Sequence, residues 1–372
     1  MTQIGPKANG GIESLLNILL GLRDVEVLIV TQHVLRDDRV QRAEHINTLI
    51  IPSGNLGNKV RRYWDILRTN RLVYRIVGDF RPDAVHINDV QFLLRGIGAL
   101  LLWGKAPVVN IRGTNPPGRP YGKHWKVLRH CDKVVVLSKD MRRDMIERMP
   151  LAPSLLREKI RVIPSIVDFE RFYPVVGNER LSLRGRLDLP PQRKIVLMAA
   201  RVCPRKQQLG FISELARQID IVPEGPLFIF AGDFSLDDDY CQQCYVAARP
   251  LLELDAIRFV GFKPNINDYM AAADLAVISS RAEGMARGMI EPLACGTPVV
   301  SFDVASAHEV LTEHHAGRVL PQGHFDRLIG EIMDLLGKPE LRRTMAQNGQ
   351  RMTRSTFHID DIVKQYKHAY FG

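Results

Sequence analysis

The chain has 372 residues and is 45% hydrophobic, which is enough for two ordinary globular domains, each with its own core. Its five cysteines are odd in number and lie mostly in apolar segments, which argues against a disulfide framework. The formal net charge of +10 comes from the first half, because residues 1–165 carry 27 Lys and Arg against 15 Asp and Glu, whereas residues 166–372 carry 24 against 26. Such a basic half is typical of a surface that meets phosphates, nucleic acid or an anionic membrane, although a solvated basic face gives the same pattern.

No segment of the sequence resembles a membrane span or a signal peptide. The longest apolar candidate, residues 96–104 (GIGALLLWG), is much shorter than the roughly twenty residues that cross a bilayer. We therefore expect a cytoplasmic protein, either free or bound peripherally at the cytoplasmic face of a membrane.

Short apolar runs alternate with amphipathic segments through the first half. The runs that resemble buried strands are 25–31, 48–52, 84–88, 107–112, 133–138 and 161–165. Residues 58–80 have the pattern of one long helix that gathers basic residues and interfacial aromatics, namely Lys59, Arg61, Arg62, Arg68, Arg71, Arg75, Tyr63, Trp64 and Tyr74. This helix is either suited to an anionic membrane surface or an ordinary amphipathic helix packed on a sheet.

The second half repeats the same alternation. Its predicted strands are 194–201, 227–232, 257–261, 275–279 and 298–303. Alternation of β-branched runs with helices predicts parallel sheets covered on both faces, with ligands outside the carboxyl ends of the strands. The sequence therefore predicts an α/β protein of two Rossmann-like domains, joined near the polar, proline-containing stretch 168–193.

Residues 281–303 (RAEGMARGMIEPLACGTPVVSFD) combine two carboxylates with a turn of small residues. Residues 281–288 are predicted to form a turn that leads into a helix at about Met289, and free N–H groups at such a helix start suit a diphosphate. Glu283 would lie at the mouth of the turn, and Glu291 in the first helical turn could bind a ribose. Both carboxylates could equally be ordinary, one solvated and one favoured by the helix dipole.

A second cluster follows the predicted strand 194–201. Arg201 and Lys206 lie five residues apart in the loop that enters the next helix. Two cations at the carboxyl edge of the same sheet can neutralise a diphosphate leaving group.

Four segments, in this order, resemble glycosyltransferase family 4, the retaining nucleotide-sugar glycosyltransferases of the GT-B fold. They are RVIPSIVDFERFYP (161–174), AARVCPRKQQ (199–208), FAGDF (230–234) and SSRAEGMARGMIEPLACGTPVV (279–300). The resemblance implies two Rossmann-like domains with parallel sheets that face each other across a cleft. The expected boundaries are 1–167 for an acceptor domain, 168–193 for a linker, 194–350 for a donor domain and 351–372 for a helix that crosses back to the first domain.

The resemblance also implies roles for individual residues. Glu283, Arg201 and Lys206 would be catalytic. The donor would be bound by these three and by Gly10, Gly11, Phe262, Gly284, Met285, Ala286, Arg287, Gly288 and Glu291. Arg112, which stands where the family often has a histidine, and His86 are the predicted acceptor-binding residues.

The resemblance implies a hexosyltransferase that needs neither a metal ion nor another cofactor. Its partners would be a UDP- or GDP-sugar, a glycan or lipid-linked acceptor of bacterial surface polysaccharide or glycoconjugate synthesis, and an anionic membrane surface, but not nucleic acid. The alternatives are a nucleotide-sugar epimerase or hydrolase of the same fold, and a basic nucleic-acid-binding protein, although no nucleic-acid motif accompanies the charge. Asp237, Asp238 and Asp239 are expected at a helix start rather than on a metal, and Cys241 and Cys244 are expected to be plain helix positions.

Overall fold

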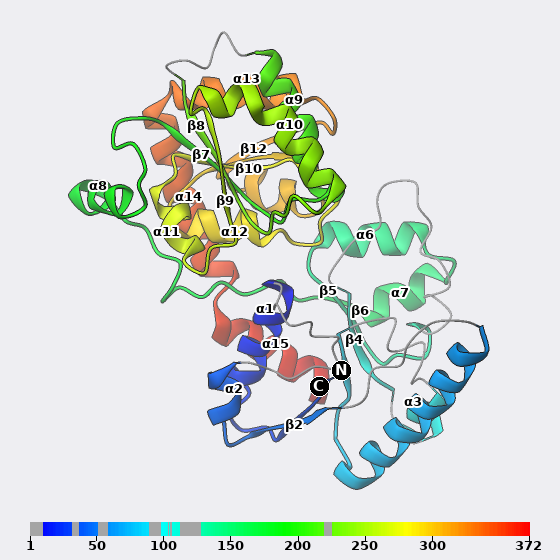
Figure 1. Ribbon diagram of the computed structural model, residues 1–372. Coiled ribbons are helices and arrows are strands. Elements are labelled where there is room, and N and C mark those ends of the chain that lie inside the picture. Colours follow the sequence, from blue (N-terminus) through cyan, green and yellow to red (C-terminus); the bar gives the residue numbers. More distant parts are fainter. Residues whose placement is uncertain are drawn as a thin grey trace. The chain divides into compact units, whose positions relative to one another are not determined.

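The computed structural model describes residues 10–31, 37–50, 59–88, 98–102, 104, 106–111, 128–218 and 225–372. The chain divides into two compact units (Figure 1). The first unit comprises Met1–Ile166 and Ile359–Gly372, and the second comprises Val167–His358.

The first unit holds two groups of parallel strands. β1 (Val27–Thr31) pairs with β2 (Ile46–Ile50), and a four-stranded sheet has the order β3 (His86–Ile87), β4 (Val108–Ile111), β5 (Val134–Val136) and β6 (Ile160–Val162). The helices are α1 (Gly10–Gly21), α2 (Asp38–Arg42), α3 (Lys59–Phe80), α6 (Lys139–Arg148), α7 (Pro153–Lys159) and α15 (Ile359–Phe371). Every strand predicted in this half therefore has a counterpart in the structure, and the long helix predicted over 58–80 is confirmed as α3.

The last helix of the chain completes the core of this unit. Ile362 and Tyr366 of α15 pack with Ile18 of α1 and with Val135 of β5. The Tyr366 hydroxyl also accepts a hydrogen bond of 2.8 Å from Nδ2 of Asn110. The amino-terminal half of the chain thus needs residues from its far end to bury its sheet.

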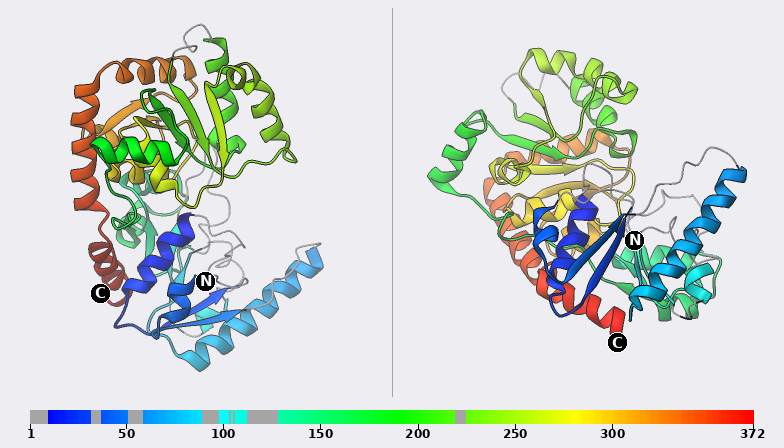
Figure 2. Two further views of the ribbon diagram at one scale, coloured as in Figure 1. Left: turned by 60° about the vertical axis from the view of Figure 1, so that its left-hand side comes forward. Right: turned by 60° about the horizontal axis from the view of Figure 1, so that its bottom comes forward.

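The second unit is a six-stranded parallel sheet in the order β12-β11-β10-β7-β8-β9. The strands are β7 (Ile195–Ala199), β8 (Leu227–Ala231), β9 (Ile257–Gly261), β10 (Leu275–Ile278), β11 (Val299–Phe302) and β12 (Gly317–Leu320). The helices are α8 (Gly177–Arg186), the short η1 (Pro204–Lys206), α9 (Gln208–Arg217), α10 (Asp239–Glu253), α11 (Ile266–Ala272), α12 (Arg287–Ala294), η3 (His308–Thr312), α13 (Phe325–Leu336) and α14 (Pro339–Thr356). Their arrangement around the sheet can be followed in Figure 2.

Both faces of this sheet are buried, which explains why its strands are continuous apolar runs. Alternate residues such as Val196, Phe228 and Val277 belong to one cluster with α9, α10 and α13. Their neighbours Leu197 and Ile229, which point to the opposite face, are equally buried.

The strand order places a topological switch point between β7 and β10. From β7 the chain proceeds outward through β8 and β9, and it then returns to the other side of β7 with β10 and β11. Loops that leave two such neighbouring strands in opposite directions open a crevice at the carboxyl edge, where open α/β sheets bind ligands.

Three details differ from the sequence-based predictions. The stretch 168–193 contains α8 and belongs to the second unit, where α8 packs on α11. The expected boundary after residue 350 falls inside α14, and the chain returns to the first unit only at Ile359. β12 was not predicted, because its four residues do not form a strong apolar run. Pairing with β11 holds this strand in place.

Candidate functional site

The loop after β7 is fixed in shape by one buried side chain. Gln208, at the start of α9, is completely buried; its Nε2 donates to the main-chain oxygen of Arg201 at 2.9 Å, and its Oε1 accepts from the Cys203 amide at 3.3 Å. Gln207 adopts a left-handed conformation with φ of 57°, which is uncommon for a residue other than glycine. The backbone from Arg201 to Lys206 is therefore held as a compact turn above β7.

The loop after β10 is tied directly to this turn. The Arg281 amide donates to the main-chain oxygen of Arg205 at 2.8 Å, and the Ser279 hydroxyl donates to the main-chain oxygen of Lys206 at 2.7 Å. These contacts join the two loops at the switch point, so the basic turn and the glutamate-containing segment form one surface.

Glu283 is the centre of the charged cluster on that surface. Its Oε1 forms an ion pair with Nζ of Lys206, and its Oε2 lies 3.3 Å from Nη1 of Arg205. The side chains of Glu283 and Lys206 are 8% and 17% exposed, so this pair is largely shielded from water. Arg201 is 61% exposed, and its Nε lies 3.9 Å from Oδ2 of Asp233. The structure thus brings Lys206 and Glu283 together and leaves Arg201 at the solvent side of the loop.

Glu291 lies farther along the same segment, on α12. This helix begins at Arg287 rather than at about Met289, so Glu291 is in its second turn and not, as predicted, in its first. The earlier start brings Arg287 into the helix four residues before Glu291, a spacing at which the two side chains can pair. Nε of Arg287 donates to Oε1 of Glu291 at 2.5 Å, an i, i+4 pair that holds the buried carboxylate.

The amino end of α12 carries no side-chain cap, because its N-cap residue is Ala286. Uncapped N–H groups and the positive end of the helix dipole favour an anion at this position. Gly288 allows the helix to lie close to β7, since a Cβ there would be 3.1 Å from the main-chain oxygen of Ala199. The helix start is therefore directed at the same edge as Lys206.

The other predicted site residues are distributed between the two units. Phe262 follows β9 in the second unit and is exposed. Gly10 and Gly11 form the first turn of α1 in the first unit, and the segment before them lies outside the described residues. His86 is in β3, where a hydrogen bond of 2.9 Å joins its Nδ1 to the Tyr370 hydroxyl. Arg112 lies outside the described residues.

Arg205 is the charged neighbour of Glu283 that the sequence analysis did not select. A sequence signal existed, because Arg205 and Lys206 are adjacent. Adjacent residues normally point apart, but the short helix η1 turns both cations toward Glu283.

The acidic run 237–239 lies at a helix start, as predicted. Oδ1 of Asp238 caps α10 by accepting a hydrogen bond from the Cys241 amide at 3.0 Å, and Cys241 and Cys244 are buried helix positions. Among the described residues, no group of three His, Cys, Asp or Glu side chains gathers as metal ligands.

Two units with parallel sheets, and a charged cluster at the switch point of the second, are typical of the GT-B fold, and solved structures agree. A glycosyltransferase from Rickettsia africae aligns with a TM-score of 0.81 over 99% of this chain and 96% of its own, at 17% identity. HepE from Anabaena, solved in complex with UDP and glucose, aligns with a TM-score of 0.81 over 98% and 97% of the two chains, at 21% identity.

Sequence comparisons give the family. The model for Glycosyltransferase Family 4 matches residues 11–171, and the model for Glycosyl transferases group 1 matches residues 179–352. The chain belongs to glycosyltransferase family 4. It is 27% identical over 293 residues to a D-inositol 3-phosphate glycosyltransferase of Xylanimonas cellulosilytica, an alignment that covers 76% of this chain and 65% of the relative. Alignments with the next two relatives span 54% and 53% of their lengths.

Proposed function

We propose that this protein moves a hexose from a UDP- or GDP-sugar to a glycan or lipid-linked acceptor, with retention of the anomeric configuration. The observation that carries this proposal is the cluster of Lys206, Arg205 and Glu283 beside the uncapped start of α12, at the switch point of the second sheet. Family membership gives the reaction class, and one structural neighbour supports the donor class by name, because HepE was solved in complex with UDP-glucose.

The donor diphosphate would bind where positive charge converges. Lys206 and Arg201 supply two cations, and the backbone N–H groups of residues 284 to 288 supply the helix-terminal donors. Charge accumulates on the diphosphate as the glycosidic bond breaks, so groups already fixed at this position stabilise the transition state more than the ground state. The network of Gln208 and Ser279 provides that fixation.

The two glutamates would contact the sugars at either side of the diphosphate. Glu291, which accepts a hydrogen bond from Arg287, would also accept hydrogen bonds from the ribose hydroxyls. Glu283 would orient the transferred hexose while also holding Lys206. Phe262, exposed after β9, would lie beside the nucleobase.

Transfer with retention needs no proton-accepting side chain in this proposal. The C–O bond between the hexose and the phosphate breaks, the acceptor hydroxyl bonds to the same face of the hexose, and an oxygen of the leaving phosphate takes the hydroxyl proton. The protein's cations neutralise the departing diphosphate, so we propose that no metal ion is required. Activity should therefore survive EDTA; loss of activity that Mg²⁺ or Mn²⁺ restores would contradict this part of the proposal.

The acceptor is proposed to come from bacterial surface polysaccharide or glycoconjugate synthesis, reached at an anionic membrane surface. The supporting observation is an exposed face of α3 on which Trp64 and Tyr74 alternate with Arg68, Arg71 and Arg75. The helical segment 98–102 is joined to α3 through the hydrogen bond of 2.7 Å from the Ala99 amide to Oδ1 of Asn70, and its Leu102 is 81% exposed. No helix in the described part of the chain has the length and apolarity needed to span a bilayer. Arg112 and His86 are the proposed acceptor-side residues.

The experiment that tests this function is a panel of UDP- and GDP-sugars, read first by thermal shift and then by nucleotide release. One donor should raise the melting temperature, and nucleotide release from it should require an acceptor. Release without any acceptor would favour a hydrolase, and interconversion of the sugar without release would favour an epimerase. A chain that is stabilised by oligonucleotides and by none of the sugars would overturn the assignment.

A further inference from the structure

A pocket opens at the amino-terminal edge of the six-stranded sheet, opposite the edge that carries Lys206 and Glu283. Its volume is about 540 Å³, which is within the usual range for small-molecule sites. It is lined at the strand starts by Lys194 and Asp274, at the end of α12 by residues 295–298, and on α14 by Arg342, Arg343 and Gln347. None of the residues that bind the donor in our proposal lines this pocket.

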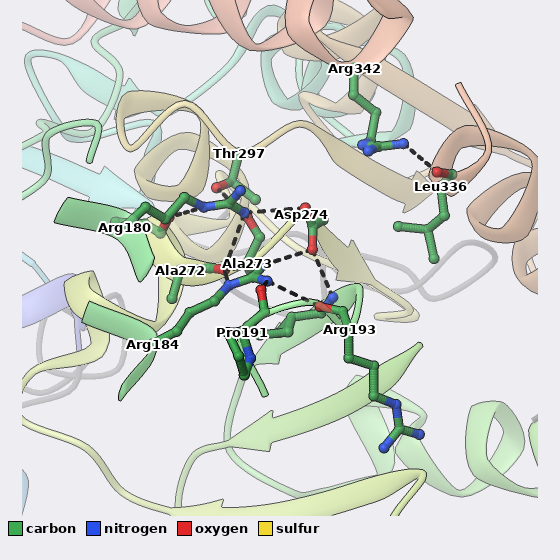
Figure 3. A network of polar contacts seen from close by, with 12 residues as sticks. Arg180, Arg184, Pro191, Arg193, Ala272, Ala273, Asp274, Thr297, Leu336 and Arg342 are labelled. Atoms are coloured by element: carbon green, nitrogen blue, oxygen red, sulfur yellow. Dashed lines mark hydrogen bonds and ion pairs between the residues drawn. The ribbon is translucent and has the colours of Figure 1, made fainter. Parts of the chain in front are cut away.

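One wall of the pocket is an arginine network built on Asp274 (Figure 3). Oδ2 of Asp274 accepts from Nη2 of Arg184 at 2.8 Å, and Oδ1 accepts from Nη2 of Arg180 at 3.3 Å. The same two arginines donate to main-chain oxygens at the carboxyl end of α11, for example from Arg180 to Ala273 at 2.7 Å. One carboxylate thus serves two guanidinium groups.

Arg342, like Arg184, is buried, and it adds a guanidinium without adding a carboxylate. The residue is 8% exposed, and its Nη1 donates to the main-chain oxygens of Leu335 and Leu336 at the end of α13. Among the described residues these two oxygens are its only acceptors, so Nε and Nη2 are not engaged by any of them. Buried arginines are usually paired with an acid, and this one instead lines a pocket.

The pocket therefore carries an excess of positive charge. Its lining contains Arg180, Lys194, Arg342 and Arg343 against the single carboxylate of Asp274. Arg343 is exposed and pairs with Glu340 at 2.5 Å. Burial lowers the pKa of the Arg342 guanidinium. Burial also lowers the pKa of the Arg180 guanidinium; Asp274 opposes this shift, and repulsion from Arg184 adds to it. An anion at this position would relieve both effects.

The uncharged part of the lining indicates what the anion is attached to. Pro174, Val175 and Val176 form an apolar side, and the amides of Gln347 and Gln350 supply neutral hydrogen-bonding groups. A bare inorganic ion would use only the cationic wall. A small organic phosphate would fill the charged, apolar and amide sides together.

We propose that this amino-edge pocket binds a small phosphate ester, such as a sugar phosphate, with its phosphoryl group between Arg342 and Lys194. The pocket is separate from the donor site, yet it borders the turn of residues 295–298 at the end of α12, the helix that begins at Arg287 and carries Glu291 in its second turn. The inference does not depend on the identity of the donor.

The test uses the full chain and two probes, inorganic phosphate and glucose 6-phosphate, titrated by calorimetry at physiological salt. The wild type should bind glucose 6-phosphate saturably below about 1 mM and inorganic phosphate more weakly. Lys194→Gln with Arg343→Gln removes two exposed cations of the lining without touching the Asp274 network, and Arg342→Lys keeps the charge but loses the guanidinium. Each should weaken glucose 6-phosphate binding by about tenfold.

Two controls decide the location. Arg217→Gln with Arg327→Gln removes two exposed cations elsewhere in the second unit and should leave binding unchanged. Lys206→Ala, which alters the proposed donor site, should also leave it unchanged. Binding that is lost with Lys206→Ala and kept in the pocket variants would overturn the proposal, because the phosphate would then occupy the donor site. Equal affinity for both probes, or no saturable binding of either, would overturn it as well.

Discussion

At the level of single residues, the ion pair between Lys206 and Glu283 determines what the lysine can do in the proposed donor site. The ion pair removes the Lys206 ammonium from bulk water and fixes its position beside the uncapped start of α12. A preorganised cation of this kind costs little reorganisation when charge develops on a leaving group. Arg201, which the sequence suggests as its equal, is far more exposed and less constrained.

Lys206→Ala should therefore lower kcat by about 100-fold, while donor affinity falls less, because the lost charge acts mainly in the transition state. Arg205→Ala should cost about tenfold or less, since that side chain is largely solvated. Turnover and KM measured with the preferred donor test this ranking. Lys338→Ala, an exposed lysine outside the proposed donor site, is the matched control. Equal losses in kcat and in donor affinity would indicate simple ground-state binding.

Gly232, at the end of β8, permits a close backbone approach that no other residue would tolerate. A Cβ at this position would lie 2.1 Å from the main-chain oxygen of Ala200 and 2.8 Å from the Arg201 amide nitrogen. Gly232→Ala should destabilise the protein by about 2 kcal/mol and displace the turn that carries Arg201. In Gly330→Ala, by contrast, the new methyl group meets nothing within 4 Å inside α13, so this variant should be more stable by up to about 1 kcal/mol. Denaturant midpoints of the two variants should move in opposite directions.

At the level of elements, α8 and α11 are joined by charge rather than by apolar packing alone. Arg180 and Arg184, one turn apart on α8, cap the carboxyl end of α11 and pair with Asp274. Burial by itself would raise the pKa of Asp274, but Arg180, the Ile195 amide and Arg184 together lower it below its ordinary value of 3.8. A segment that sequence reasoning treated as a linker is thereby made part of the second unit.

This arrangement predicts a specific dependence of stability on pH. A carboxyl with a lowered pKa in the folded state stabilises the fold above pH 3.8, its ordinary pKa, and that contribution is lost as the pH falls through the lower folded value. Asp274→Asn should cost about 3 kcal/mol at neutral pH, because it leaves the buried Arg184 and the partly buried Arg180 without their counterion. It should also flatten the acid limb of the stability curve below about pH 4. Exposed Asp326→Asn is the control, and an unchanged acid limb in Asp274→Asn would contradict the assignment.

At the level of the whole molecule, the basic charge and the exposed aromatics coincide on the first unit. Trp64 is 66% exposed on α3, and Tyr74 and Leu67 lie on the same exposed face. Val73 and Val77, on the other side of the helix, are buried. The helix therefore packs its inner side into the unit and presents aromatic and basic groups outward.

Vesicle co-sedimentation should show binding to anionic lipid and not to neutral lipid, weakening as salt rises. Replacing Arg68, Arg71 and Arg75 by Gln should reduce that binding by at least tenfold, since each cation near such a surface contributes about 1 kcal/mol. The same replacement of Arg142, Arg143 and Arg157 on α6 and α7 removes equal charge from another part of the unit and should have a smaller effect. If the wild type and both variants all fail to bind anionic vesicles, this result would favour an acceptor in solution.

The sequence by itself determined the class of fold and much of the candidate site. Buried parallel strands are continuous apolar runs, so eleven of the strands could be located, and Glu283 and Glu291 beside a glycine-rich turn indicated the sheet edge at which we propose that the diphosphate binds. The tertiary structure decided which charges meet. Loops that are 77 residues apart in sequence bring Lys206 to Glu283, and Arg184 reaches Asp274 across 90 residues. No local pattern encodes those pairs, because they depend on which strands become neighbours in the sheet. For the same reason the amino-edge pocket, whose walls come from α8, from the turn after α12 and from α14, could not be predicted from the sequence.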